Sequence, residues 1–85
     1  MLPSMAKFQV GSVVYWKWLG NRIDGRVEEI FEHPIEREIK GKKIKRNGSP
    51  EKPAYLVRSE AGNLALKLET EVFDLKALKA KYGDN

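Results

Sequence analysis

The chain has 85 residues, no cysteine and a formal net charge of +4. This length suffices for one domain with one core and leaves no room for a deep substrate cleft, while the missing cysteines exclude disulfides and thiolate metal sites. Because no apolar run reaches the roughly 20 residues of a membrane helix, we expect no membrane partner. The cysteine-free composition fits a reducing compartment, so we expect a cytoplasmic protein.

The first strand is expected at residues 11–18, where β-branched and aromatic residues dominate between glycines. Alternation with a period of two gives this strand an uncharged core face and a more polar outer face. The core face holds Val14, Trp16 and Trp18. The outer face holds Val13, Tyr15 and Lys17.

A second strand is expected at residues 23–31. Gly25 suits a tight bend or the close approach of another strand. Val27 points inward by alternation, but Ile30 is out of phase with it, so we expect a β-bulge at the two glutamates between them that curls the sheet. The pattern leaves open whether Phe31 is the inward residue instead.

Two short runs flank Lys40–Gly41 and predict a β-hairpin made of residues 35–39 and 42–46. Most of its side chains are charged, so the hairpin should project from the barrel and be half exposed. The segment 47–53 is dense in Asn, Gly, Ser and Pro and is expected to be a loop.

Two further strands are expected at residues 54–59 and 64–68, joined by a tight turn. Leu64, Leu66 and Leu68 share one face of the second strand, which is the clearest core signal in the chain. We expect a single core that contains Val14, Trp16, Val27, Leu64, Leu66 and Leu68.

The spacing of apolar residues becomes helical at residues 74–82. Leu75, Leu78 and Tyr82 form one stripe, and Asp74 is suited to cap the first turn. So short a helix is marginal in water by itself, and we expect it to dock across an open end of the barrel.

Short strands with tight turns, followed by one helix, indicate a mostly β fold. We predict a small curled antiparallel β-barrel of about five strands with a short C-terminal α-helix. The expected parts are a flexible tail at residues 1–7, the barrel at 8–73, and a C-terminal helix and tail at 74–85 packed on the barrel.

Two runs in the second half of the chain, KRNGSPEKPAYLV from Lys45 and SEAGNLALK from Ser59, resemble a known family. They are similar to the Tudor-like domain of the hypervirulence-associated proteins, which are small bacterial and fungal proteins, and the opening GSVVYWKW is similar to its first strand. The resemblance covers residues 8–73 and implies an SH3-like barrel. The chain departs from the family pattern at Ser12, where Asp is usual. The resemblance implies no settled biochemical activity.

The sequence contains no pattern of residues that is typical of a catalytic site. The one histidine, His33, precedes a proline in a predicted turn, and the chain offers no cysteine and only scattered serines as nucleophiles. No phosphate-binding loop, dinucleotide fingerprint or metal-ligand spacing occurs. We therefore predict a non-enzymatic binding module without a cofactor or metal, and we leave its oligomeric state open.

The leading candidate site is the basic hairpin of residues 37–52. The stretch from Arg37 to Arg58 has eight basic and two acidic residues, a net +6, which leaves −2 for the rest of the chain. Lysines beside exposed backbone N–H groups suit phosphates, so the expected ligand is nucleic acid or another polyanion. The expected contacts are Lys40, Lys42, Lys43, Lys45, Arg46, Gly48, Ser49 and Lys52. The alternative is that the lysines only keep an edge hairpin soluble.

A second interpretation rests on aromatic residues, which Tudor barrels can arrange as a cage for methylated side chains and which can also stack on bases. This alternative site is a peptide-binding surface of Tyr15, Trp18 and Tyr55. Against it, Trp16 and also Trp18 are suited to fill the core and the mouth of the barrel. A third interpretation is an interaction protein without a ligand.

Overall fold

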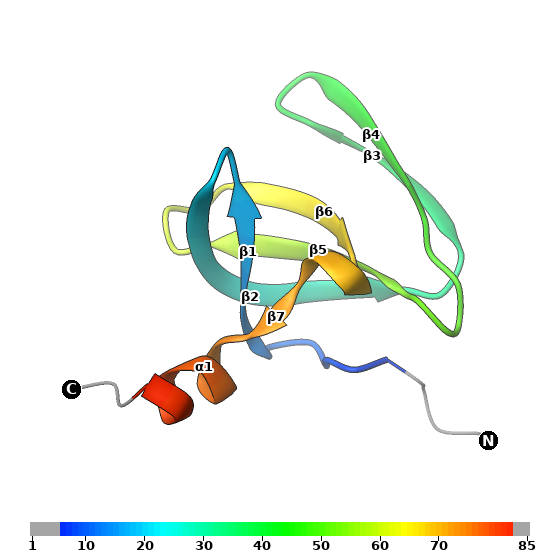
Figure 1. The fold of residues 1–85 in the computed structure, drawn as a ribbon. Coiled ribbons are helices and arrows are strands. Elements are labelled where there is room, and N and C mark those ends of the chain that lie inside the picture. Colours follow the sequence, from blue (N-terminus) through cyan, green and yellow to red (C-terminus); the bar gives the residue numbers. More distant parts are fainter. Residues whose placement is uncertain (1–5, 83–85) are drawn as a thin grey trace.

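A computed structural model describes residues 6–82 as antiparallel strands with one α-helix (Figure 1). The strands are β1 (Val13–Trp18), β2 (Asn21–Phe31), β3 (Pro34–Ile39), β4 (Lys42–Asn47), β5 (Ala54–Ser59), β6 (Leu64–Leu68) and β7 (Phe73–Asp74). The helical segments are the 3₁₀ turn η1 (Glu69–Glu71) and the helix α1 (Leu75–Tyr82). This arrangement confirms the predicted mostly β fold with a short C-terminal helix.

Five strands form one curled sheet in the order β6-β5-β2-β1-β7, and β3 and β4 form a separate hairpin inserted between β2 and β5. The long strand β2 pairs with β1 along its first half and with β5 along its second half, so this strand carries the bend that curls the sheet. Strand β7 pairs with β1 and was not predicted, because two residues are too few to show a periodicity.

The predicted bulge is present in β2, where the pairing with β5 shifts register between Val27 and Glu29. The bulge returns Ile30 to the side of Val27, and both pack in the same apolar cluster. A close strand approach at Gly25 is also present, since a Cβ there would lie 2.1 Å from the carbonyl oxygen of Arg58. These two features let β2 bend closely against β5.

The interior of the barrel is an apolar cluster, hereafter the barrel core, whose members come from segments between Ala6 and Val72. Its buried members are Phe8, Val14, Trp16, Val27, Tyr55, Val57 and Val72. The inward positions predicted for Val14, Trp16 and Val27 are confirmed.

A second apolar cluster, the outer cluster, lies on the other face of β5 and β6. Its buried members are Phe31, Ala54, Leu56 and Leu66, with Leu64 and Leu68 packed against them. The prediction of a single core was therefore wrong. Alternate residues of β5 enter different clusters because this strand is covered on both faces.

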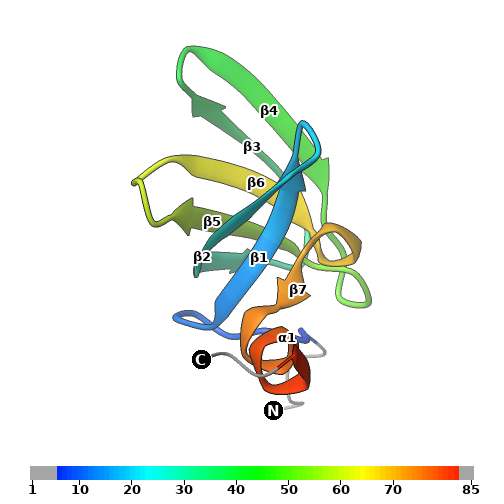
Figure 2. The same cartoon turned by 60° about the vertical axis from the view of Figure 1, so that its left-hand side comes forward.

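The β3–β4 hairpin covers the outer cluster. Ile35, Ile39 and Ile44 pack against that cluster, whereas the side chains on the opposite face of the hairpin are exposed. The hairpin is half exposed as predicted, and its buried half forms a second layer over the sheet (Figure 2).

Helix α1 begins after Asp74, whose Oδ1 accepts a hydrogen bond from the backbone N–H of Ala77 at 3.2 Å, so the predicted cap is confirmed. Leu75 is buried and Leu78 is half-buried. The side chain of Tyr82, the third residue of the predicted stripe, lies outside the described part of the chain, as do residues 83–85 of the predicted C-terminal tail.

The N-terminal end of the described chain contacts the barrel. Phe8 is buried, Ala6 packs against the barrel core, and the backbone N–H of Lys7 donates to Oε2 of Glu69 at 2.8 Å. Residues 1–5 of the tail predicted at 1–7 lie outside the described residues.

Candidate ligand-binding cleft

On the exposed face of the β3–β4 hairpin, two lysines lie opposite glutamates. In the antiparallel register, Lys43 lies opposite Glu38 and Lys45 lies opposite Glu36. Side chains that are directly opposite in antiparallel strands are about 5 Å apart at Cβ, which lets opposite charges attract. Two of the lysines predicted to bind a polyanion therefore have an acidic neighbour within the hairpin itself.

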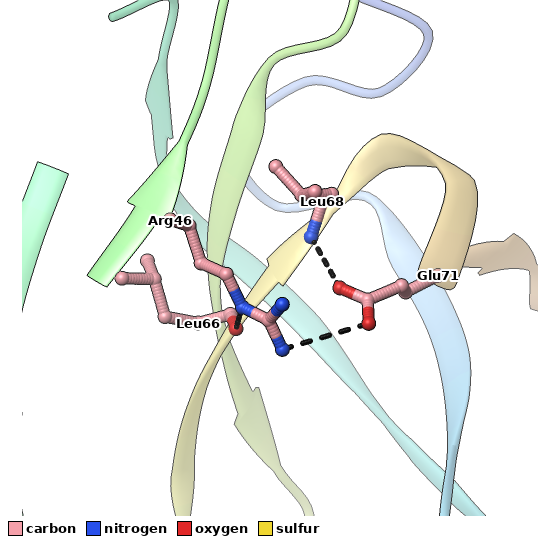
Figure 3. A network of polar contacts seen from close by, with 4 residues as sticks. All are labelled: Arg46, Leu66, Leu68 and Glu71. Atoms are coloured by element: carbon pink, nitrogen blue, oxygen red, sulfur yellow. Dashed lines mark hydrogen bonds and ion pairs between the residues drawn. The ribbon is translucent and has the colours of Figure 1, made fainter. Parts of the chain in front are cut away.

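Arg46, another predicted contact, holds the hairpin to the sheet (Figure 3). Its Nε donates to the carbonyl oxygen of Leu66 at 3.2 Å, and its Nη2 lies 3.5 Å from Oε2 of Glu71. Oε1 of Glu71 accepts a hydrogen bond from the backbone N–H of Leu68 at 2.8 Å. These contacts, which we call the Arg46 clasp, satisfy backbone groups on the edge strand β6.

The remaining charge of the hairpin lies at its tip. Arg37 pairs with Glu29 at 3.1 Å, so this arginine, Arg46 and the two outer lysines all have acidic neighbours. Within residues 6–82 none of Lys40, Lys42, Lys43 and Lys45 forms an ion pair, but Lys42 lies opposite Ile39 and Lys40 lies in the turn, so these two exposed lysines have no glutamate opposite them. The fold therefore concentrates the uncompensated positive charge of the hairpin at these two lysines.

The loop after β4 is closed on itself. Gly48 is buried, and a Cβ there would lie 2.5 Å from the carbonyl oxygen of Phe31, so its role is to let two backbone segments approach. The backbone N–H of Ser49 donates to the carbonyl oxygen of Lys52 at 3.0 Å, and Oγ of Ser49 accepts from the backbone N–H of Lys52 at 3.1 Å. The Ser49 amide, expected to face an anion, is thus engaged within the loop.

Tyr55 lies in the barrel core and not on the surface, which corrects its place in the predicted peptide site. Its hydroxyl donates to Oε2 of Glu69 at 2.6 Å and accepts from the backbone N–H of Phe8 at 3.3 Å. Burial, reinforced by the hydrogen bond to the Glu69 carboxylate, raises the pKa of Tyr55 above its ordinary value. Alternation could not reveal this position because both faces of β5 are buried.

Tyr15 and Trp18 lie on opposite faces of β1, so the fold does not bring them into one site. Tyr15 is half-buried and stacks on Phe73 of β7 with ring centroids 5.2 Å apart. Trp18 is 59% exposed, which corrects the expectation that it fills the mouth of the barrel. It pairs with Asn21 at the end of the β1–β2 hairpin, beyond the strands that cover Trp16.

Trp18 lines a cleft of about 550 Å³ between three hairpin ends, which point toward the same side of the molecule (Figures 1 and 2). The apolar residues of its lining are Trp16, Trp18, Ile23, Ala61, Leu64 and Ala65. The charged residues are Arg22, Asp24, Lys40 and Glu60. The short length of the chain predicted no room for a deep cleft beside the core. The observed cleft lies between the turns, outside the barrel core.

Apart from Trp18 and Lys40, the residues that line this cleft were not predicted from the sequence, and neither was a role for the exposed residue that follows Trp18. Glu60 lies on the β5–β6 turn and lines the cleft, whereas Leu19, which follows Trp18 in the β1–β2 turn and is 78% exposed, is not one of the lining residues. One signal was available: the pair Leu19–Gly20 stands where a two-residue hairpin turn ordinarily has Asn–Gly. The other contributions come from turns distant in sequence, and only the fold brings them together.

Three further features of the described residues concern the histidine, possible metal sites and membrane-spanning helices. His33 is exposed, with its Nδ1 2.9 Å from the carbonyl oxygen of Pro34. Within residues 6–82, no group of three or more His, Asp or Glu residues is placed to hold a metal ion. None of the helices in that range is long and apolar enough to cross a membrane.

The curled five-stranded sheet is that of a small β-barrel, the fold expected of a Tudor-like domain, and such domains are small binding modules in general. A family model described as the Hypervirulence associated proteins TUDOR domain matches residues 11–72, most of the chain. The chain therefore belongs to this family, and the resemblance seen in the sequence is confirmed. No curated protein and no solved structure matches it.

Proposed function

We propose that the protein is a non-enzymatic module that binds a segment of another protein in the cleft, with Trp18 as the main contact. The observation that carries this proposal is an exposed tryptophan on the wall of an apolar cleft. Exposed tryptophans are costly in water and are enriched among the residues that dominate binding energy at protein interfaces. Membership of a Tudor-like family supports a binding role in general.

The charges favour a protein segment over a polyanion as the ligand. Most cations of the hairpin have acidic neighbours, and the cleft itself is lined by two basic and two acidic residues. A phosphate backbone needs a groove of one sign, whereas a peptide carries apolar groups and both charges. A mainly apolar cleft with balanced charge suits the peptide.

The test uses a phage-displayed library of linear 12-residue peptides and the full chain. The peptide that binds most tightly is synthesised with a fluorophore, and its affinity for the protein is measured by fluorescence anisotropy. We expect Trp18→Ala to weaken binding by about 30-fold or more, the loss typical of a dominant interface residue, with little change in the thermal midpoint. The matched control is Phe73→Ala, which removes an exposed aromatic ring of β7 that stacks on Tyr15, on the face of β1 opposite to Trp18, and should leave affinity unchanged. Equal affinity of Trp18→Ala and the unmodified protein would refute the site.

A second candidate function, binding of a polyanion such as nucleic acid, is supported by the two uncompensated lysines at the hairpin tip. Here Lys40→Ser with Lys42→Ser should weaken oligonucleotide binding and reduce its salt slope by about 0.7–0.9 for each phosphate that is no longer neutralised. The matched pair Lys43→Ser with Lys45→Ser should do neither, since those lysines face glutamates. Oligonucleotide binding at low salt together with failure of the peptide screen would place this candidate first.

A further inference from the structure

Two residues in the described chain hold a backbone conformation that ordinary side chains disfavour. Among residues 6–82, Leu19 and Lys40 are the non-glycine residues with positive φ, at 51° and 52°. Each is the first residue of a two-residue hairpin turn, followed by Gly20 and Gly41, whose φ values are also positive. Turns of this kind strongly prefer Asn, Asp or Gly at the first position, because a Cβ crowds the backbone there.

Packing does not explain why these two side chains are present. Leu19 is 78% exposed and Lys40 is also exposed. Lys40 forms no ion pair within residues 6–82. An asparagine at either place would fit the turn better and would give up no buried contact. Backbone strain that the fold itself does not need is a feature of functional sites.

The two turns meet at the same cleft. Lys40 lines it from the β3–β4 hairpin, and Trp18, the residue before Leu19, lines it from the β1–β2 hairpin. The cleft therefore has an apolar lip at Trp18 and a cationic lip at Lys40. Leu19 is not one of the lining residues, but it follows Trp18 directly in the turn and its side chain is exposed. Glu60 lies on the third turn and has the opposite charge.

We propose that Leu19 and Lys40 contact the ligand and persist despite their cost to stability, and that the ligand is an extended protein segment that places an acidic side chain beside an apolar one. This inference rests on the function proposed above. The apolar side chain packs on Trp18 and Leu19, and the acidic one pairs with Lys40. Because Glu60 repels an acidic side chain at the third turn, the charges orient the bound segment.

The proposal makes opposite predictions for stability and affinity. We expect Leu19→Asn and Lys40→Asn each to raise the thermal midpoint by roughly 4 °C. Each should also lower the affinity for the peptide selected from the library by about tenfold. Lys40→Arg keeps both the charge and the strain, so it should change neither quantity. Val10→Asn and Lys45→Asn are the controls, because they replace an exposed aliphatic residue and an exposed lysine by asparagine away from the cleft, and they should not reduce affinity.

The outcomes separate this inference from the function on which it rests. If no peptide is enriched on the unmodified protein, the proposed function fails and the inference fails with it. If a peptide binds and Trp18→Ala abolishes it while Leu19→Asn and Lys40→Asn bind normally, the function stands and the inference is overturned. Enriched peptides that lack acidic residues, or asparagine variants that are no more stable than the unmodified chain, also overturn it.

Discussion

Trp16 and Trp18 are two residues apart on the same face of β1, yet their environments are opposite. Trp16 is 3% exposed in the barrel core, and Trp18 is 59% exposed at the cleft. Alternation assigns both to one face, but burial also requires a covering strand, and the cover ends before the hairpin turn. A residue near the end of a strand can therefore keep the phase of the core and still be free to contact a ligand.

Tyr55 shows how a buried polar group ties distant segments together, and its titration is testable. Its folded pKa is raised above the unfolded value of about 10, so the neutral hydroxyl stabilises the fold below that pH and loses this contribution as the pH rises further. Tyr55→Phe leaves Glu69 and the Phe8 N–H without this partner, and we expect it to cost about 1–2 kcal/mol at neutral pH. Urea unfolding from pH 7 to 11 should show that the difference in the free energy of unfolding between Tyr55→Phe and the unmodified protein shrinks above pH 10. A constant difference would contradict this account.

At the scale of elements, the β3–β4 hairpin is attached by isoleucines on one face and by the Arg46 clasp at its base. The clasp satisfies backbone groups of β6 that would otherwise form an open sheet edge. Such edges invite pairing with other chains, so covering one also protects against aggregation. Because Lys40 sits at the tip of this hairpin, the clasp also sets where one lip of the cleft lies.

We expect Arg46→Ala to loosen the hairpin without unfolding the barrel. The ion pair with Glu71 is partly exposed and contributes at most about 1 kcal/mol, and the hydrogen bond to Leu66 adds a similar amount. Amide hydrogen exchange should accelerate in β3, β4 and the free edge of β6, and should stay slow in β1 and β2. Arg37→Ala, which removes the ion pair to Glu29 on the same hairpin, is the control and should leave the β6 amides protected. Unchanged exchange at β6 in Arg46→Ala would rule out the clasp.

At the scale of the whole molecule, the C-terminal helix and the cleft lie at different ends. Both views show α1 below the barrel, away from the turn between β1 and β2 (Figures 1 and 2). Leu75, which anchors this helix, is buried but does not line the cleft. The fold thus stabilises its lower end with the helix and leaves its upper turns to form the cleft.

Removal of residues 75–85 should therefore lower stability and spare binding. Loss of the buried Leu75 side chain alone should cost about 2–3 kcal/mol, which is a large share of the stability of a domain this small. Peptide affinity per folded molecule, measured below the lowered thermal midpoint, should match that of the full chain. A folded truncation that no longer bound the selected peptide would show that α1 shapes the cleft.

The sequence by itself determined the strands other than β7, the bulge in β2, the helix cap at Asp74 and the family, because these depend on local periodicity, turn chemistry and a contiguous motif. The tertiary structure alone decided that β5 is buried on both faces, that Tyr55 is internal and that Arg37 and Arg46 pair with glutamates outside the hairpin. It also decided the cleft, since its walls come from turns as distant as Trp18, Lys40 and Glu60. Which surfaces meet depends on how the sheet curls and where the hairpin folds over it, and no local pattern records that.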